Sequence, residues 1–290
     1  MLDDIEETVY TRLPEKFQPV AQKWFYVLNP RLSWTYRRKP DEVDQAFVDR
    51  FFDDEVEFDR YRTEFLESEI GEVCMNAESA IPDEYTVFDA HRKDTLKYYT
   101  LVRKFEPSVV VETGVYNGVS TAALLLGLRE NDHGHLHSVD CSARLRDEDG
   151  VASRREYFER GRPSCSEPGS AELVPGREPG WILPDSLRER WTLHEGHPRE
   201  RLPDLLADLG SVDVFVHDSE HSTSCMLFEF ELAWRHLSRD GLILSSHIHW
   251  NDAFETFVDE HDCESGLTTF HYLGYEGERV PCRTGFIRKA

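Results

Sequence analysis

The pattern of apolar and polar positions changes character near residue 108 of this 290-residue chain. From there, short β-branched and apolar runs alternate with segments whose apolar residues recur every three to four positions, which is typical of parallel strands joined by helices. The predicted strands are Val109–Glu112, His135–Val139, Trp191–His194, Val212–His217 and Leu242–Ser245. The predicted helices are Asp89–Phe105, Val119–Arg129, Arg199–Leu209, Thr223–Leu237 and Asp252–His261. The fold class is therefore α/β, with a doubly wound, mostly parallel sheet.

Three regions depart from this alternation. Residues 1–85 mix aromatic and charged residues at helical spacing, which predicts a helical N-terminal appendage; a lid and a dimer surface within a homo-oligomer are both open interpretations. Within the main domain, residues 86–290, a Pro- and Gly-rich insert at about 141–184 follows the second strand and is either a lid or a passive surface loop. The segments Thr268–Leu273 and Arg283–Arg288 flank a Gly-rich turn and predict an antiparallel hairpin at the sheet edge.

The composition excludes several classes of partner. A net charge of −23 argues against nucleic acid and against an anionic membrane surface. The chain has 26 Arg and only 7 Lys, so an acidic surface adapted to a high-salt cytoplasm and an ordinary acidic protein are both open. No apolar run approaches the ~20 residues of a membrane span, and the acidic N-terminus is no signal peptide. The six cysteines form no C-x-x-C motif, and we expect a cytoplasmic protein with reduced thiols.

The first predicted strand runs into a turn that carries Gly114 and Gly118 and then into an apolar helix. A strand, a glycine turn and a helix N-terminus form a cradle for nucleotide-type ligands. In dinucleotide-binding turns a glycine stands where this chain has Glu112. A carboxylate there would repel phosphate but suits a ligand with an amino or sulfonium group, which favours S-adenosylmethionine over NAD or ATP. Tyr116 and Asn117 lie in the same turn and are candidate cofactor-binding residues.

Two further positions fit an adenosine ligand. Asp140 ends the second predicted strand, where a carboxylate can bind ribose hydroxyls; the alternative is an acid that caps a turn. Gly196 and His197 follow the third predicted strand and are candidates for the wall of an adenine pocket, on their position in the sheet alone.

Acids and histidines follow the next two predicted strands. Asp218 and His221 come after the fourth strand, and His247 and His249 come after the fifth. Because parallel strands on neighbouring positions present their carboxyl ends to one crevice, these side chains are expected to converge on one ion or one substrate hydroxyl. Taken singly, each is also compatible with an ordinary turn residue.

The run Glu112–Gly118, the acid Asp140 and the block 213–222 together resemble class I S-adenosylmethionine-dependent methyltransferases. Within this class the chain resembles methyltransferase domain family 24, the group that contains the macrocin, rhamnosyl and cephalosporin-pathway O-methyltransferases. The resemblance covers roughly residues 90–290 and extends to Gly241 and to the closing Gly285–Arg288. It implies a Rossmann-like methyltransferase fold and methyl transfer to a hydroxyl of a small molecule or sugar. In that reading Glu112, Gly114, Tyr116, Asn117, Gly118, Asp140, Gly196, His197 and Asp218 bind the cofactor.

One position departs from the group. Relatives carry an Asp-Asp or Asp-Asn pair after the fifth strand that helps to hold a divalent metal, whereas this chain has Ser246-His247. Either Asp218 and His247 hold a metal, with imidazole favouring Mn²⁺, Fe²⁺ or Zn²⁺ over Mg²⁺, or His221 or His247 acts as a free base. The same departure supports the alternative of a cofactor-binding regulatory protein that transfers no methyl group.

Overall fold

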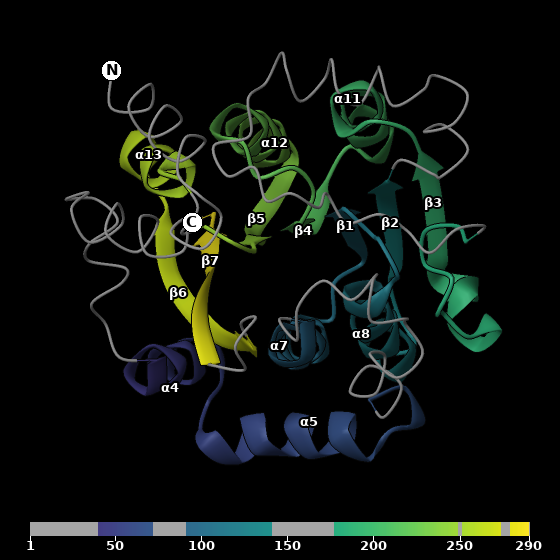
Figure 1. Cartoon of the computed structure of the whole chain (residues 1–290), viewed down its shortest axis with the longest axis vertical. Coiled ribbons are helices and arrows are strands. Elements are labelled where there is room, and N and C mark those ends of the chain that lie inside the picture. The colour runs from purple at the N-terminus through teal and green to yellow at the C-terminus, as the bar shows by residue number, and fades with distance from the viewer. Residues whose placement is uncertain (1–39, 72–90, 141–176, 249–250, 274–278, 290) are drawn as a thin grey trace, which may run out of the picture.

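The computed structural model describes residues 40–71, 91–140, 177–248, 251–273 and 279–289. Its centre is a seven-stranded sheet of order β3-β2-β1-β4-β5-β7-β6, with helices on both faces (Figure 1). The strands are β1 Val109–Thr113, β2 His135–Asp140, β3 Trp191–Glu195, β4 Val212–His217, β5 Leu237–Ser245, β6 Glu264–Leu273 and β7 Arg279–Arg288. The first five are parallel, and the order reverses between β1 and β4, which makes that point the ligand-binding switch of a doubly wound sheet.

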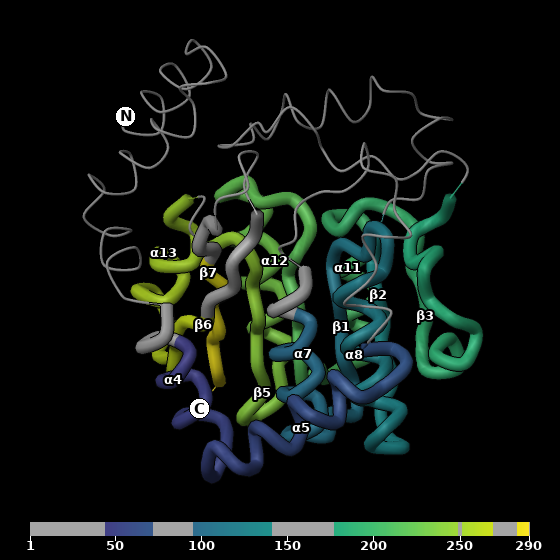
Figure 2. Tube along the Cα trace, turned by 60° about the horizontal axis from the view of Figure 1, so that its bottom comes forward, coloured from purple at the N-terminus to yellow at the C-terminus, as the bar shows by residue number. Residues whose placement is uncertain are grey.

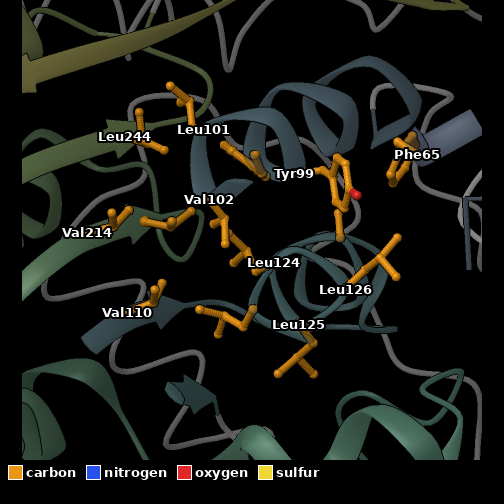
Figure 3. Close-up of a cluster of buried hydrophobic side chains, with 14 of the residues drawn as sticks. Phe65, Tyr99, Leu101, Val102, Val110, Leu124, Leu125, Leu126, Val214 and Leu244 are labelled. Carbon is orange, nitrogen blue, oxygen red and sulfur yellow. The ribbon is translucent and has the colours of Figure 1, made fainter. Parts of the chain in front are cut away.

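Alternate residues of the strands build two cores because successive side chains point to opposite faces of a sheet. Val110, Val214 and Leu244 belong to the core beneath α7 and α8, part of which is seen in Figure 3. Val111, Phe215 and Ile243, each one residue away, belong to the core beneath α11, α12 and α13. The helices are α4 Pro40–Phe51, α5 Glu55–Glu67, α7 His91–Phe105, α8 Val119–Glu130, α11 Pro198–Leu209, α12 Thr223–His236 and α13 Ala253–Glu260, with a short 3-10 helix, η3, at Asp185–Arg190. The predicted α/β fold is confirmed.

The parallel strands and their helices lie close to their predicted bounds, with one exception. β5 begins at Leu237, five residues before the predicted start at Leu242. Its early residues 238–240 are largely exposed and polar, so they carry no apolar pattern. They belong to the strand because Leu237 pairs with Val212 across a register shift and because the Asp240 amide donates a hydrogen bond to the Lys289 carbonyl.

The predicted hairpin is present and longer than expected. β6 and β7 pair in an antiparallel register from Glu264↔Arg288 to Leu273↔Arg279, and β7 also pairs with β5. The hairpin thus closes one edge of the sheet. The predicted beginning of α7 at Asp89 lies outside the described residues, as does residue 249.

The described part of the appendage packs on the main core. Phe47, Phe51 and Phe65 are almost fully buried in the cluster that also holds α7 and α8. The Phe51 ring meets the ring of Phe286 on β7 at a centroid distance of 4.7 Å, and Arg103 of α7 binds the Glu64 carboxylate of α5. Helix α5 lies on the outside of α7 in both views (Figures 1 and 2). The boundary at residue 85 lies outside the described residues and stays a prediction.

In the described part of the chain, no helix is both long enough and apolar enough to span a bilayer.

Candidate active site

One row of backbone hydrogen bonds continues past the carboxyl ends of the parallel strands. The amide of Gly196 donates to the carbonyl of Asp140 (2.9 Å), and that of Gly114 donates to Val139 (3.0 Å). On the other side of β1, the Asp218 amide donates to Thr113 (2.9 Å) and the Ser246 amide to His217 (3.1 Å). The predicted site residues are thereby held side by side along one edge, in the strand order β3-β2-β1-β4-β5.

The two glycines of the turn are needed for close packing of the chain on itself. Gly114 has a φ of +83°, and a Cβ there would lie 2.1 Å from the carbonyl oxygen of Asp218. Gly118 has a φ of +99° at the N-cap of α8, and its Cβ would lie 2.7 Å from the Cα of Gly180. Glycine is therefore required by both backbone conformation and space. The first contact brings Asp218 directly against the glycine turn.

Glu112 is fully buried, and both its oxygens accept hydrogen bonds from hydroxyl groups. Ser120 Oγ donates to Oε1, while Thr121 Oγ1 and Ser138 Oγ donate to Oε2, each at 2.8 Å. Burial raises the pKa of Glu112 to about 7, although these three hydroxyls act to lower it. The carboxylate therefore joins β1, β2 and the first turn of α8. Its predicted selection of a positively charged ligand stays a prediction.

Asp140 organises the glycine turn from the end of β2. Its Oδ2 accepts from the backbone amides of Val115 (2.8 Å) and Tyr116 (2.7 Å). Adjacent amides that point at one carboxylate oxygen form a concave anion site in the turn. Asp140 therefore caps the glycine turn, which is the alternative that the sequence left open, and its binding of ribose hydroxyls stays a prediction.

The described end of the insert covers the turn. Gly180 donates its amide to the Tyr116 carbonyl (2.9 Å), and the Trp181 indole donates to Asn117 Oδ1 (2.7 Å). Asn117 is almost fully buried, so its side chain is engaged with Trp181. The sequence did not reveal Trp181 as a partner, because the Pro- and Gly-rich surroundings mask its packing. Residues 141–176 lie outside the described residues, so a lid and a passive surface loop both stay open.

Gly196 and His197 lie at the junction between β3 and α11. Gly196 packs against the Arg201 side chain, which donates to the Glu195 carbonyl (2.7 Å). His197 is the N-cap of α11, where Nδ1 accepts from the Arg199 amide at 3.1 Å. Burial lowers the pKa of His197, which keeps the ring neutral at pH 7. Contact of either residue with adenine stays a prediction.

Asp218, His221 and His247 converge at the ends of β4 and β5, as the sequence predicted. One ligand atom from each lies within 4.8 Å of the others. The His221 and His247 rings meet edge to face at a centroid distance of 4.9 Å, and His221 Nε2 lies 3.7 Å from Asp218 Oδ1. His247 has a φ of +50°, so its backbone adopts a conformation that is uncommon for a side chain of this size.

Ser246, which we did not predict as a site residue, lies between two members of this cluster. Its hydroxyl donates to Asp218 Oδ1 and lies 3.0 Å from His221 Nε2. Beneath it lies a second unpredicted group, in which His217 Nδ1 binds Glu229 Oε2 at 2.7 Å and both side chains are fully buried. Thr113 and Ser219 also donate to Glu229. The ends of β1 and β4 and the loop that carries Asp218 are thereby tied to α12.

The charge of Glu229 is maintained by these partners. Burial alone would raise the pKa of Glu229, but the charge and hydrogen bond of His217, together with the Thr113 and Ser219 hydroxyls, lower it below its usual value. The sequence held one indication of this role. Cys225, Glu229 and Ala233 recur every four residues on the buried stripe of α12, so the acid occupies a core position.

The donor set fits a divalent ion. One carboxylate and two imidazoles are ligands that zinc and other first-row transition metals prefer over an all-oxygen environment. Their ligand atoms lie within 4.8 Å of one another, so the three side chains would have to move closer together to hold one ion. The same geometry also suits a free base, because Ser246 and Asp218 both contact or approach His221 Nε2.

Residues 111–247 match the family model described as a methyltransferase domain, Methyltransf_24. The match spans the glycine turn, Asp140 and the Asp218–His221–His247 cluster. The chain contains a methyltransferase domain. This match confirms the methyltransferase domain predicted from the sequence, and the site described above lies within it. Membership of the macrocin, rhamnosyl and cephalosporin-pathway group stays a prediction. No curated protein matches the sequence.

Solved structures with similar architecture include several methyltransferases. An O-methyltransferase from Bacillus cereus in complex with SAH is 16% identical, with a TM-score of 0.47, over 86% of this chain and 97% of that chain. TomG from Streptomyces achromogenes, in complex with SAM, is 11% identical, with a TM-score of 0.46, over 87% and 100%. A putative caffeoyl-CoA O-methyltransferase from Staphylococcus aureus is 12% identical, with a TM-score of 0.49, over 82% and 100%. Since these TM-scores lie below 0.5, the family assignment rests on the family model alone.

Proposed function

We propose that this methyltransferase domain uses S-adenosylmethionine to methylate a hydroxyl group of a small molecule or sugar. The observation that carries the proposal is the contact between Gly114 and the backbone of Asp218. It places the cluster of Asp218, His221 and His247 beside the turn that would hold the cofactor. A donor site and a proton-accepting site thus share one crevice at the switch point of the sheet.

The residues of the turn would bind the cofactor. Asp140, which already accepts hydrogen bonds from the amides of the turn, would also accept hydrogen bonds from the ribose hydroxyls. Gly196 and His197 would border the adenine. Bound S-adenosylmethionine supplies an electrophilic methyl group on a sulfonium. The protein would hold that group in line with the acceptor oxygen, which is where positioning lowers the barrier most.

The cluster after β4 and β5 would handle the proton of the acceptor. An aliphatic hydroxyl must lose its proton as it attacks, so it needs a base or a metal within reach. Asp218, His221 and His247 have the donor atoms to hold a divalent ion, which would lower the pKa of a bound hydroxyl. Without an ion, His221 or His247 would accept the proton directly.

Calorimetry and product formation test the proposal together. We expect S-adenosylhomocysteine to bind and NAD not to bind. We expect Asp140→Ala to weaken the binding of S-adenosylhomocysteine by roughly 1.5–3 kcal/mol, the scale of a hydrogen bond to a charged group. A screen of sugar and phenolic hydroxyls should then yield S-adenosylhomocysteine from S-adenosylmethionine. Affinity for NAD without affinity for S-adenosylhomocysteine would overturn the cofactor assignment. Cofactor binding without turnover on any acceptor would instead support the regulatory alternative.

A further inference from the structure

Three histidines gather on one face of the sheet, away from the candidate active site. His135 and His137 are two residues apart on β2, so both point to the same face, and His194 of β3 joins them. The ring centroids lie 4.8 Å apart for His135 and His137 and 5.4 Å apart for His137 and His194. All three side chains are half-buried. They lie on the β2–β3 side of the sheet, whereas Asp218, His221 and His247 follow β4 and β5.

The ring nitrogens of two of these histidines are spaced as two ligands of one ion would be. His137 Nδ1 and His194 Nε2 are 3.2 Å apart. Two imidazole nitrogens bound to a tetrahedral zinc at 2.0–2.1 Å lie about 3.3 Å from each other. The third ring, His135, is held by a hydrogen bond of 2.9 Å between its Nε2 and Thr192 Oγ1, so it would have to give up this bond and rotate before it could join the pair as a ligand.

The surroundings keep these imidazoles in the form that binds metals. Burial, with smaller effects from His135 and His194, lowers the pKa of His137 to about 4, and burial also lowers the pKa values of His135 and His194. Neutral imidazole is the metal-binding form. Two guanidinium groups approach the cluster, but Arg190 is bound to Asp132 and to the Gly134 carbonyl, and Arg201 to the Glu195 carbonyl. Their positive charge opposes the binding of any divalent ion, so an ion held here must bind imidazole tightly.

We propose that His137 and His194, with His135 as the third ligand, form a binding site for a late first-row transition ion such as Zn²⁺, Ni²⁺ or Cu²⁺. All-nitrogen ligation favours these ions over Mg²⁺, Ca²⁺ and Mn²⁺. The bound ion links β3 to β2 and so stabilises this side of the sheet. This site is separate from the proposed methyl-transfer centre and does not depend on it.

The competing explanation is a hydrogen bond between two neutral imidazoles, and one set of variants separates the two. Metal-stripped protein is titrated with ZnCl₂ and with NiCl₂ by calorimetry at pH 7.5. The variant His221→Ala/His247→Ala removes the histidines of the other cluster, so metal binding that this variant retains reports on the new site. We expect this variant to bind Zn²⁺ and Ni²⁺, and we expect His137→Ala/His194→Ala in the same background to weaken binding at least tenfold.

Two controls complete the test. His236→Ala in the same background removes a histidine on α12 that belongs to neither cluster, and it should leave the affinity unchanged. His194→Gln keeps a side chain that can hydrogen-bond His137 but removes a metal ligand. We expect this variant to keep the melting temperature of the metal-free protein and to lose the rise in melting temperature that Zn²⁺ produces. Absence of Zn²⁺ and Ni²⁺ binding in the His221→Ala/His247→Ala background, or equal affinity after loss of His137 and His194, would overturn the proposal.

Discussion

At the scale of single residues, Glu112 has the clearest measurable consequence. Burial raises its pKa from 4.5 to about 7, so between these values the folded protein binds more protons at this carboxyl than the unfolded chain does. The contribution of Glu112 to stability is therefore greatest at low pH and falls as the pH rises through this window. At about 1.4 kcal/mol per unit of pKa, the Glu112→Gln variant should gain about 2–3 kcal/mol relative to the natural protein between pH 5 and pH 8.

Urea unfolding of both proteins at the two pH values measures this difference. Titration of all other groups cancels in the comparison, because the two proteins differ only at residue 112. A difference in unfolding free energy that is the same at pH 5 and pH 8 would show that the carboxyl titrates normally in the folded state.

His247 allows a second test at this scale, of the metal against the free base. His247→Asp places a carboxylate beside Asp218, and a site richer in oxygen prefers Mg²⁺ more than one with two imidazoles does. We expect the variant to retain methyl transfer and to shift its preference from Mn²⁺ towards Mg²⁺, with activity abolished by a chelator in both proteins. Turnover assays with a series of ions measure the shift, with His236→Ala on α12, outside the cluster, as the control. Activity that chelators leave unchanged in the natural protein and that is lost in His247→Asp would establish His247 as a free base.

The sequence predicted the convergence of these residues but not the groups that hold them. Asp218, His221 and His247 were identifiable because they directly follow apolar strands whose carboxyl ends meet at one edge. Glu229 supports them from a helix, where an acidic residue resembles a solvent-facing one until the helix phase is known. Ser246 carries no distinctive chemistry until the fold places it between Asp218 and His221.

At the scale of elements, predictability followed burial. β1 and β4 are buried on both faces, and their continuous apolar runs predicted them to within a residue. The first part of β5 is exposed and is strand only through its pairing with β4 and with the chain end, which no local pattern encodes. The packing of the insert end on the glycine turn could not be predicted either. Gly180 donates to Tyr116 and Trp181 donates to Asn117, each across 64 residues of the chain.

That packing predicts a specific cost for one substitution. Gly118→Ala would force the start of α8 away from Gly180, since the new Cβ would lie 2.7 Å from its Cα. We expect a lower melting temperature and at least a tenfold loss of affinity for S-adenosylhomocysteine, because the turn cannot keep its shape. Gly210→Ala is the matched control: φ is also positive at +73°, but nothing lies within 4 Å of the new Cβ. The control should lower the melting temperature and leave the affinity unchanged. Equal affinities in the two variants would show that the contact with Gly180 does not shape the cofactor site.

At the scale of the whole molecule, the net charge of −23 is carried by a chain with two apolar cores, one on each face of the sheet. Several carboxylates that pair with cations remain largely in water, including Asp53, Asp132 and Asp185, whose side chains are 87%, 95% and 107% exposed. Exposed pairs of this kind contribute little to stability. The excess of negative charge is therefore a net repulsion across the surface rather than a set of compensated pairs.

This repulsion predicts how stability depends on salt. The Debye length shrinks from about 10 Å at 0.1 M to about 3 Å at 1 M, so added salt screens neighbouring carboxylates from one another. If the acidic surface is an adaptation to a high-salt cytoplasm, the melting temperature should rise steeply between 0.1 M and molar KCl. Choline chloride at equal ionic strength provides the control. General screening raises the melting temperature with either cation, whereas specific binding of K⁺ to carboxylates raises it in KCl alone. A melting temperature that stays flat or falls in both salts would leave an ordinary acidic protein, whose stability depends on the two apolar cores and not on its surface charge.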